Sequence, residues 1–188
     1  MEKTISSYHV TPGQIMIESD EIRAAQKNLL KFSVLYDHYY LQIFRFILKR
    51  IDSEELTADL TQQVFYKAMK NLKGYRFEGL PFSSWLFRIA RNEINMEMRS
   101  SRVKRTVYVQ TEQLMLIAEE TGIEEKEEQI AIMMQTLLKI EPEELEIVEM
   151  RYFENRPHKE IAEILNISEG NAKVRLHRVI QKMKSKLI

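Results

Sequence analysis

The sequence predicts an all-α protein made of two small helical domains. Only five glycines and four prolines interrupt its 188 residues, and apolar residues recur at intervals of three and four over long stretches. Fourteen of the seventeen aromatic residues lie between Phe32 and Tyr108, whereas the last third of the chain has only Tyr152 and Phe153. Because aromatic side chains dominate cores, this uneven distribution predicts two separate cores rather than one.

The first domain is predicted over residues 31–106, after an extension of residues 1–30 that has no clear pattern and no assigned role. Its first helix begins near Phe32 and keeps its apolar spacing for over four turns. A second helix begins after Ser53, a residue type that caps helices. Its buried face is expected to comprise Leu56, Leu60, Val64, Phe65, Ala68 and Leu72. On a helical wheel the opposite, exposed face holds Asp59, Gln62, Tyr66 and Lys70.

A loop that ends at Pro81 precedes a third helix, predicted from about Phe82 to Val103. The core side of this helix is expected to hold Phe82, Trp85, Leu86, Ile89 and Met96. Arginines and asparagines occupy a sector about 100° wide: Arg88, Arg91, Asn92, Asn95, Arg99 and Arg102. Surface helices normally mix charges of both signs, so this sector favours nucleic-acid binding. In the loop, Tyr75 and Phe77 are candidates to stack on unpaired bases.

Residues 107–128 are interpreted as an acidic linker with at most one short helix. Between Glu112 and Glu128 there are seven glutamates against Lys126 alone. The second domain, residues 129–188, is predicted to end in a helix-turn-helix. Three residues indicate this motif. Pro157 suits the start of the first helix, Asn166 tolerates the left-handed conformation of the turn, and Ser168 suits the cap of the second helix.

The last helix is strongly basic, with six cations and no carboxylate beyond Gly170. Its apolar stripe comprises Ala172, Leu176, Val179, Ile180, Met183 and Leu187. If the start of this helix enters the major groove, the residues facing bases or phosphates are Asn171, Lys173, Val174, His177 and Arg178. Val174 suits a thymine methyl group, and Arg178 suits guanine. A solvated cationic face is an equally open interpretation of this helix by itself.

Composition disfavours several classes of function. The absence of cysteine excludes disulfides, thiolate metal sites and cysteine nucleophiles. No histidine follows a glutamate by three residues, and no HExxH or P-loop string occurs, so we expect no catalytic residue, metal site or cofactor. The N-terminus lacks the apolar core of a signal peptide, and no run of about 18 apolar residues is present. A cytoplasmic protein without membrane insertion is therefore expected.

The segment ADLTQQVF, the later segment GYRFEGLPFSSWLFRIARN and Arg99 together resemble region 2 of bacterial sigma factors of the extracytoplasmic-function (ECF) group. Region 4 is matched by IEPEELEIVEMRYFENRPHKEIAEILNISEGNAKVRLHR. The resemblance covers roughly Phe32–Arg105 and Ile130–Leu187. It implies two helical modules, joined by a linker, that bind core RNA polymerase and direct it to promoters.

The resemblance also implies which residues bind each partner. Region 2 docks on the clamp coiled coil of the β′ subunit, and the matching residues are Asp59, Gln62 and Phe65, the last expected to support rather than touch. Residues for the −10 element are Tyr75, Arg76, Phe77, Arg88, Arg91, Asn92, Asn95 and Arg99. Region 4 rests on the β flap and reads the −35 element through Asn171, Lys173, Val174, Arg175, His177 and Arg178. An anti-sigma factor is left open as a further partner.

Two alternatives remain beside this interpretation. A conventional helix-turn-helix regulator explains the last third of the chain but leaves ADLTQQVF and the arginine-asparagine sector without a purpose. A helical adaptor that binds only protein is the other. The chain also departs from the family at Ala58, usually acidic, at Met96, often aspartate, and in GNAKVR, which replaces GTVKSR. Its promoter sequence therefore cannot be copied from relatives.

Overall fold

The computed structural model describes residues 12–100, 106, 109, 111–122 and 127–185. These residues form helices and the turns between them, and none of them is in a strand, so the predicted all-α class is confirmed. The chain divides into two compact units between Val107 and Tyr108. We call the described residues 12–106 the N-terminal unit and the described residues 109–185 the C-terminal unit. Each unit has its own core, as the distribution of aromatic residues predicts.

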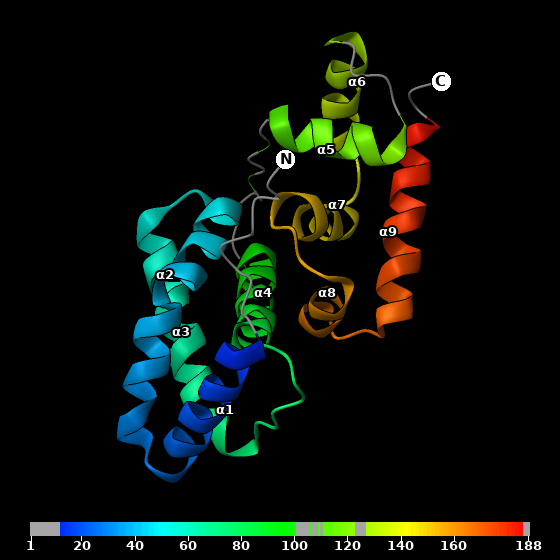
Figure 1. Cartoon of the computed structure of the whole chain (residues 1–188). Coiled ribbons are helices and arrows are strands. Elements are labelled where there is room, and N and C mark those ends of the chain that lie inside the picture. The colour runs from blue at the N-terminus through cyan, green and yellow to red at the C-terminus, as the bar shows by residue number, and fades with distance from the viewer. Residues whose placement is uncertain (1–11, 101–105, 107–108, 110, 123–126, 186–188) are drawn as a thin grey trace. The chain divides into compact units, whose positions relative to one another are not determined.

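The N-terminal unit is a bundle of α2, α3 and α4, with α1 packed on α2 (Figure 1). Its elements are α1 (Pro12–Lys27), η1 (Leu29–Lys31), α2 (Phe32–Ile51), α3 (Glu54–Asn71), η2 (Leu72–Gly74) and α4 (Phe82–Ser100). Wholly buried side chains from the three bundle helices include Leu35, Ile43, Val64 and Leu86. Ser53 begins α3 as predicted, since its hydroxyl accepts a hydrogen bond from the Leu56 amide at 3.4 Å.

The helix α1 was not predicted, because residues 1–30 show no clear apolar period. The structure supplies the reason. The buried face of α1 is half polar: Ile22 and Ala25 are buried, but so are Glu18 and Ser19. Hydrophobic periodicity cannot reveal a helix whose packed face holds a carboxylate and a hydroxyl. Residues 12–27 therefore belong to the N-terminal unit rather than to a separate extension.

The C-terminal unit is built of five α-helices and a π-helical turn among its described residues. They are α5 (Thr111–Thr121), α6 (Glu127–Leu137), α7 (Pro142–Val148), η3 (Glu149–Phe153), α8 (His158–Leu165) and α9 (Glu169–Lys184). The core of the helix-turn-helix joins α8 to α9 through Ile161, Ala162, Ala172 and Leu176. Figure 1 shows α8 and α9 joined by a short turn.

The linker predicted over residues 107–128 was allowed one short helix, and Thr111–Thr121 forms one, α5. This helix contacts η3, so it packs as part of the C-terminal unit. Leu114, Ile117 and Ala118 are buried, at the spacing of a helix face that packs on a core. The surrounding glutamates masked this short stripe in the sequence. Residues 123–126 lie outside the described residues, as do three residues of the predicted faces, Arg102, Lys186 and Leu187.

No helix in the described part of the chain is both long enough and apolar enough to cross a bilayer.

Candidate nucleic-acid interface

The predicted arginine-asparagine sector forms one face of α4. Asn92 and Arg99 are exposed, and Arg88, Arg91 and Asn95 are partly exposed. The opposite side packs in the bundle through Leu86, Ala90 and Ile94. The Arg99 Nε atom donates to the Asn95 carbonyl at 2.9 Å, which holds that arginine along the helix. We call Arg88, Arg91, Asn92, Asn95 and Arg99 the α4 face.

The one buried acid of α4 among the described residues pairs with α3 rather than with the α4 face. Glu93 is buried, and its carboxylate receives the Lys67 ammonium of α3 at 2.6 Å. The α4 face therefore consists of three guanidinium groups and two amides, a set of donors that suits phosphate oxygens.

The prediction that Met96 lies on the core side of α4 is wrong, because Met96 is 53% exposed. It lies on the flank of a buried face that is centred on Leu86 and Ala90.

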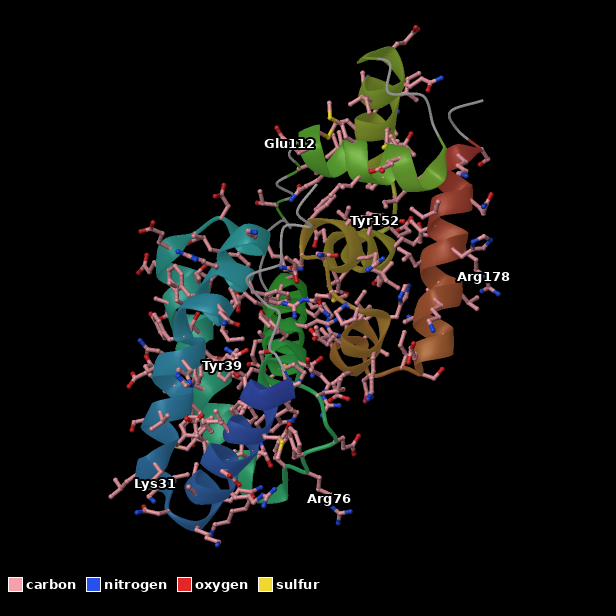
Figure 2. The ribbon with its side chains drawn as sticks, in the orientation of Figure 1. Lys31, Tyr39, Arg76, Glu112, Tyr152 and Arg178 are labelled. Atoms are coloured by element: carbon pink, nitrogen blue, oxygen red, sulfur yellow. The ribbon has the colours of Figure 1, made fainter. Side chains whose placement is uncertain are left out.

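The loop before α4 divides into a packed end and an exposed centre. The Tyr75 ring lies 5.2 Å from that of Phe82 and 4.8 Å from that of Trp85, centroid to centroid. Phe82 and Trp85 are buried. Arg76 and Phe77 are exposed, and Figure 2 shows Arg76 directed away from the helices. Stacking on an unpaired base is therefore open to Phe77, whereas the half-buried Tyr75 ring packs on Phe82 and Trp85.

The three predicted docking residues lie on two sides of α3. Asp59 and Gln62 are exposed, whereas Phe65 is buried. The Phe65 ring packs among aromatic rings from α2, with centroids 6.4 Å from Phe32 and 4.7 Å from Tyr36. Phe65 thus fixes the rotation of α3 that turns Asp59 and Gln62 outward, which agrees with its expected supporting position.

The turn between α8 and α9 has the predicted geometry. Asn166 adopts the left-handed conformation, with φ 55° and ψ 49°. The Ile167 amide closes the end of α8 on the Ala162 carbonyl at 3.0 Å. Ser168 then caps α9, where its hydroxyl accepts the Asn171 amide at 3.2 Å. These contacts fix the position at which α9 begins.

The basic side of α9 is exposed over all six predicted −35 residues: Asn171, Lys173, Val174, Arg175, His177 and Arg178. Val174 is 48% exposed, an apolar residue off the packed stripe. Lys173 pairs with Glu169 at 2.7 Å, and this ammonium lowers the pKa of the Glu169 carboxyl. Among the described residues, none holds the Arg178 guanidinium by a hydrogen bond or an ion pair, and Figure 2 shows it projecting from the unit.

A buried ionic cluster lies just before α8, and the sequence did not reveal it. Arg156 is 1% exposed; its Nε donates to Glu154 at 2.5 Å, and its Nη1 lies 3.5 Å from Glu160. The Arg156 amide also bonds to the Met150 carbonyl at 2.9 Å. The cluster thereby ties the π-helical turn η3 to the first turn of α8. The only signal in the sequence is the spacing of Arg156 and Glu160, which four residues separate.

A second buried carboxyl lies in the N-terminal unit. Glu18 of α1 accepts hydrogen bonds from the Tyr39 hydroxyl and from the Phe82 amide, the latter at 2.9 Å. Burial is the main cause that raises the pKa of Glu18 to about 7, and the nearby charge of Glu21 adds to it. The Glu21 carboxylate itself lies 3.7 Å from Nδ1 of His38, which is on α2.

This pKa predicts how stability depends on pH. An unfolded glutamate titrates near 4.3, so the folded N-terminal unit binds more protons than the unfolded chain between about pH 4.3 and 7. The contribution of Glu18 is fully present below that range and is lost as the pH rises through about 7, by roughly 4 kcal/mol at most. Urea unfolding followed by Trp85 fluorescence should show this decline in the wild type. In Glu18→Gln the decline should be smaller; equal slopes in both proteins would contradict the assignment.

Comparison with known proteins covers both units. Residues 35–103 match the family model for Sigma-70 region 2, and residues 130–183 match the model for Sigma-70, region 4. The ECF RNA polymerase sigma factor BldN of Streptomyces coelicolor is 26% identical, over 80% of this chain and 58% of BldN. The RNA polymerase sigma factor YlaC of Bacillus subtilis is 28% identical, over 81% of this chain and 90% of YlaC. The chain thus spans less than two thirds of BldN but nine tenths of YlaC.

A solved structure has the same fold. CnrH, in complex with the cytosolic domain of CnrY, matches with a TM-score of 0.58 and 20% identity. The match covers 90% of this chain and 96% of CnrH.

Proposed function

Because the chain belongs to the sigma-70 family and is a sigma factor of the ECF type, which directs transcription initiation, we propose how its surfaces divide that task. The N-terminal unit docks on core RNA polymerase through Asp59 and Gln62 of α3, at the clamp coiled coil of β′. The α4 face and the loop before it bind the −10 element. The C-terminal unit rests on the β flap and reads the −35 element through α9.

The observation that carries this proposal is the composition of the α4 face together with the inward turn of Glu93. A solvated face would keep its acid at the surface, where water screens it. Here Glu93 is buried against Lys67, and the other acid of α4, Glu97, stands away from the α4 face on the helical wheel. The exposed and partly exposed donors of the face are those that contact a nucleic-acid backbone. A conventional helix-turn-helix regulator has no use for this face, which lies in the other unit from the helix-turn-helix.

The two DNA-binding surfaces have different chemistry. The α4 face and Phe77 suit a separated strand, because arginines neutralise its phosphates and aromatic rings stack on its bases. The helix α9 suits a duplex, because a helix fits the major groove and an arginine fork matches guanine. Held by one polymerase, the two units raise each other's effective concentration at the promoter.

Sigma factors are transcription initiation factors rather than catalysts, and we assign no catalytic activity, cofactor or metal to this chain. Among the described residues no three acidic or histidine side chains gather in a metal-binding arrangement. Since its proposed partners are core polymerase and promoter DNA, the protein acts in the cytoplasm. An anti-sigma factor remains a partner to test, because CnrH, of the same fold, was solved in complex with the cytosolic domain of CnrY.

Docking through α3 predicts the effect of the double change Asp59→Ala/Gln62→Ala. Both side chains are exposed, so the change should leave the unfolding transition of Trp85 in place. It should weaken the binding of core polymerase at least tenfold, or about 1.4 kcal/mol, because charge-assisted hydrogen bonds are lost. Affinity is measured by titrating labelled protein with core polymerase. Asp37→Ala, which removes an exposed acid of α2, is the matched control. Normal affinity in the double variant would place the docking surface elsewhere.

A further inference from the structure

The loop that joins η2 to α4 is held at both of its ends by α1. At its start, the Gln26 side-chain amide donates to the Leu72 carbonyl at 2.9 Å and to the Tyr75 carbonyl at 2.8 Å. At its end, the Glu18 carboxyl accepts the Phe82 amide at 2.9 Å. Figure 1 shows α1 beside this loop. Residues 46 to 64 positions apart in sequence are thus joined by polar contacts from a single helix.

The two contacting side chains lie on the packed side of α1. Glu18 and Gln26 are eight residues apart, which corresponds to about 12 Å along a helix axis. Between them, Ile22 and Ala25 are buried. The apolar pair fixes α1 against the bundle, and the polar pair sets the distance between the two ends of the loop.

Burial alone does not explain these two polar residues. A helix that served only to cover the core would be more stable with apolar side chains at such positions, because burying a carboxyl is unfavourable. Both groups instead bond to main-chain atoms at the ends of the loop. Glu18 satisfies an amide in the first turn of α4, where a helix has free donors. Gln26 satisfies carbonyls where η2 ends.

The centre of the loop, unlike its two ends, is exposed to solvent. Arg76, Phe77, Glu78 and Gly79 are all exposed. Gly79 has φ 74°, a conformation that glycine adopts without strain. The position of the exposed centre therefore depends on where its two ends are fixed.

We propose that α1 is the positioning element of the −10 loop, and that Gln26 and Glu18 are its positioning residues. The inference rests on the proposed function, since it takes the loop and the α4 face as the −10 surface. Neither residue touches DNA. Together they keep the loop at the start of the α4 face, so that Phe77 and the arginines meet the same strand. Organising a loop before it binds removes part of the ordering cost of binding.

The test compares variants of the full chain, assembled with core polymerase, on single-stranded DNA from the non-template −10 region of a promoter that the wild-type holoenzyme transcribes. Gln26→Glu keeps the shape of the side chain but sets an acceptor against two carbonyls. Glu18→Leu removes both acceptors, whereas Glu18→Gln keeps an oxygen for the Phe82 amide and a donor for the Tyr39 hydroxyl. Ile47→Val, in the buried part of α2, is the stability control, because it should lower the free energy of unfolding as a mild core change does.

We expect Gln26→Glu and Glu18→Leu to bind the single strand at least tenfold more weakly than Ile47→Val. Glu18→Gln should bind within threefold of the wild type. Affinity for core polymerase and for −35 duplex should be unchanged in all variants, since those surfaces lie elsewhere. Single-strand affinities equal to that of Ile47→Val would overturn the inference while leaving the proposed function in place. Failure of the wild-type holoenzyme to bind the strand would instead contradict the proposed function.

Discussion

Replacing Arg156 with methionine should destabilise the C-terminal unit by about 3–5 kcal/mol, because the change leaves two buried carboxylates without their cation. Glu154 and Glu160 are both buried, and Arg156 is the side chain that joins them. The loss is measured by urea unfolding of the full chain, followed by far-UV circular dichroism. Trp85 lies in the N-terminal unit, so its fluorescence transition should not move.

A matched variant separates the loss of charge pairing from the loss of packing. In Arg156→Met/Glu154→Gln/Glu160→Gln the uncompensated charges are gone, so most of the stability should return. Arg156→Met should also weaken −35 binding, and recovery of that binding in the triple variant would show that the cluster acts by placing α8 and α9. A loss below about 1 kcal/mol in Arg156→Met would mean that the cluster does not stabilise the unit.

Replacing Arg178 with alanine should weaken −35 recognition by the holoenzyme by about 1–3 kcal/mol, the range for a bidentate contact with guanine. Arg178 projects from α9 and is the exposed guanidinium one turn after Val174 (Figure 2). Affinity is measured on duplexes that differ at single −35 positions. Discrimination should disappear at one position and persist at the others.

The control for this change is Lys182→Ala. Lys182 is held by Glu144 at 2.6 Å, and it lies more than two turns beyond the start of α9. Its loss should cost less and should affect all sequences alike, as a phosphate contact does. If Arg178→Ala leaves the −35 preference unchanged, Arg178 does not read bases.

Features set by local chemistry could be predicted from the sequence. The cap at Ser53, the left-handed Asn166 and the cap at Ser168 each follow from the properties of one residue type, and each is confirmed. The exposed Asp59 and Gln62 follow from the 100° advance per residue of a helix whose apolar stripe is complete. Together with the two motifs that resemble regions 2 and 4, these features were sufficient to predict the fold and the family.

Features that depend on tertiary packing of polar groups could not be predicted. Glu18 and Arg156 are buried, although glutamate and arginine are the residue types that a pattern of apolar residues assigns to the surface. Their partners, Phe82 and Glu154, are identified by geometry rather than by spacing. The helix α1 was missed for this reason, and with it the contacts of Gln26. Met96 was misplaced for a simpler reason: the apolar face predicted for α4 was too wide and included a position at its exposed edge.

The most direct test is run-off transcription with bacterial core RNA polymerase on a genomic promoter library, with the purified full chain as the added factor. The two units, carried by the polymerase, should start transcripts at a set of promoters that share a −35 and a −10 element at one fixed spacing. The same reactions with Arg178→Ala should give promoters that no longer share one position of the −35 element but keep its other positions and the −10 element. A correctly folded chain that yields no start site above core polymerase alone would contradict its function as a sigma factor.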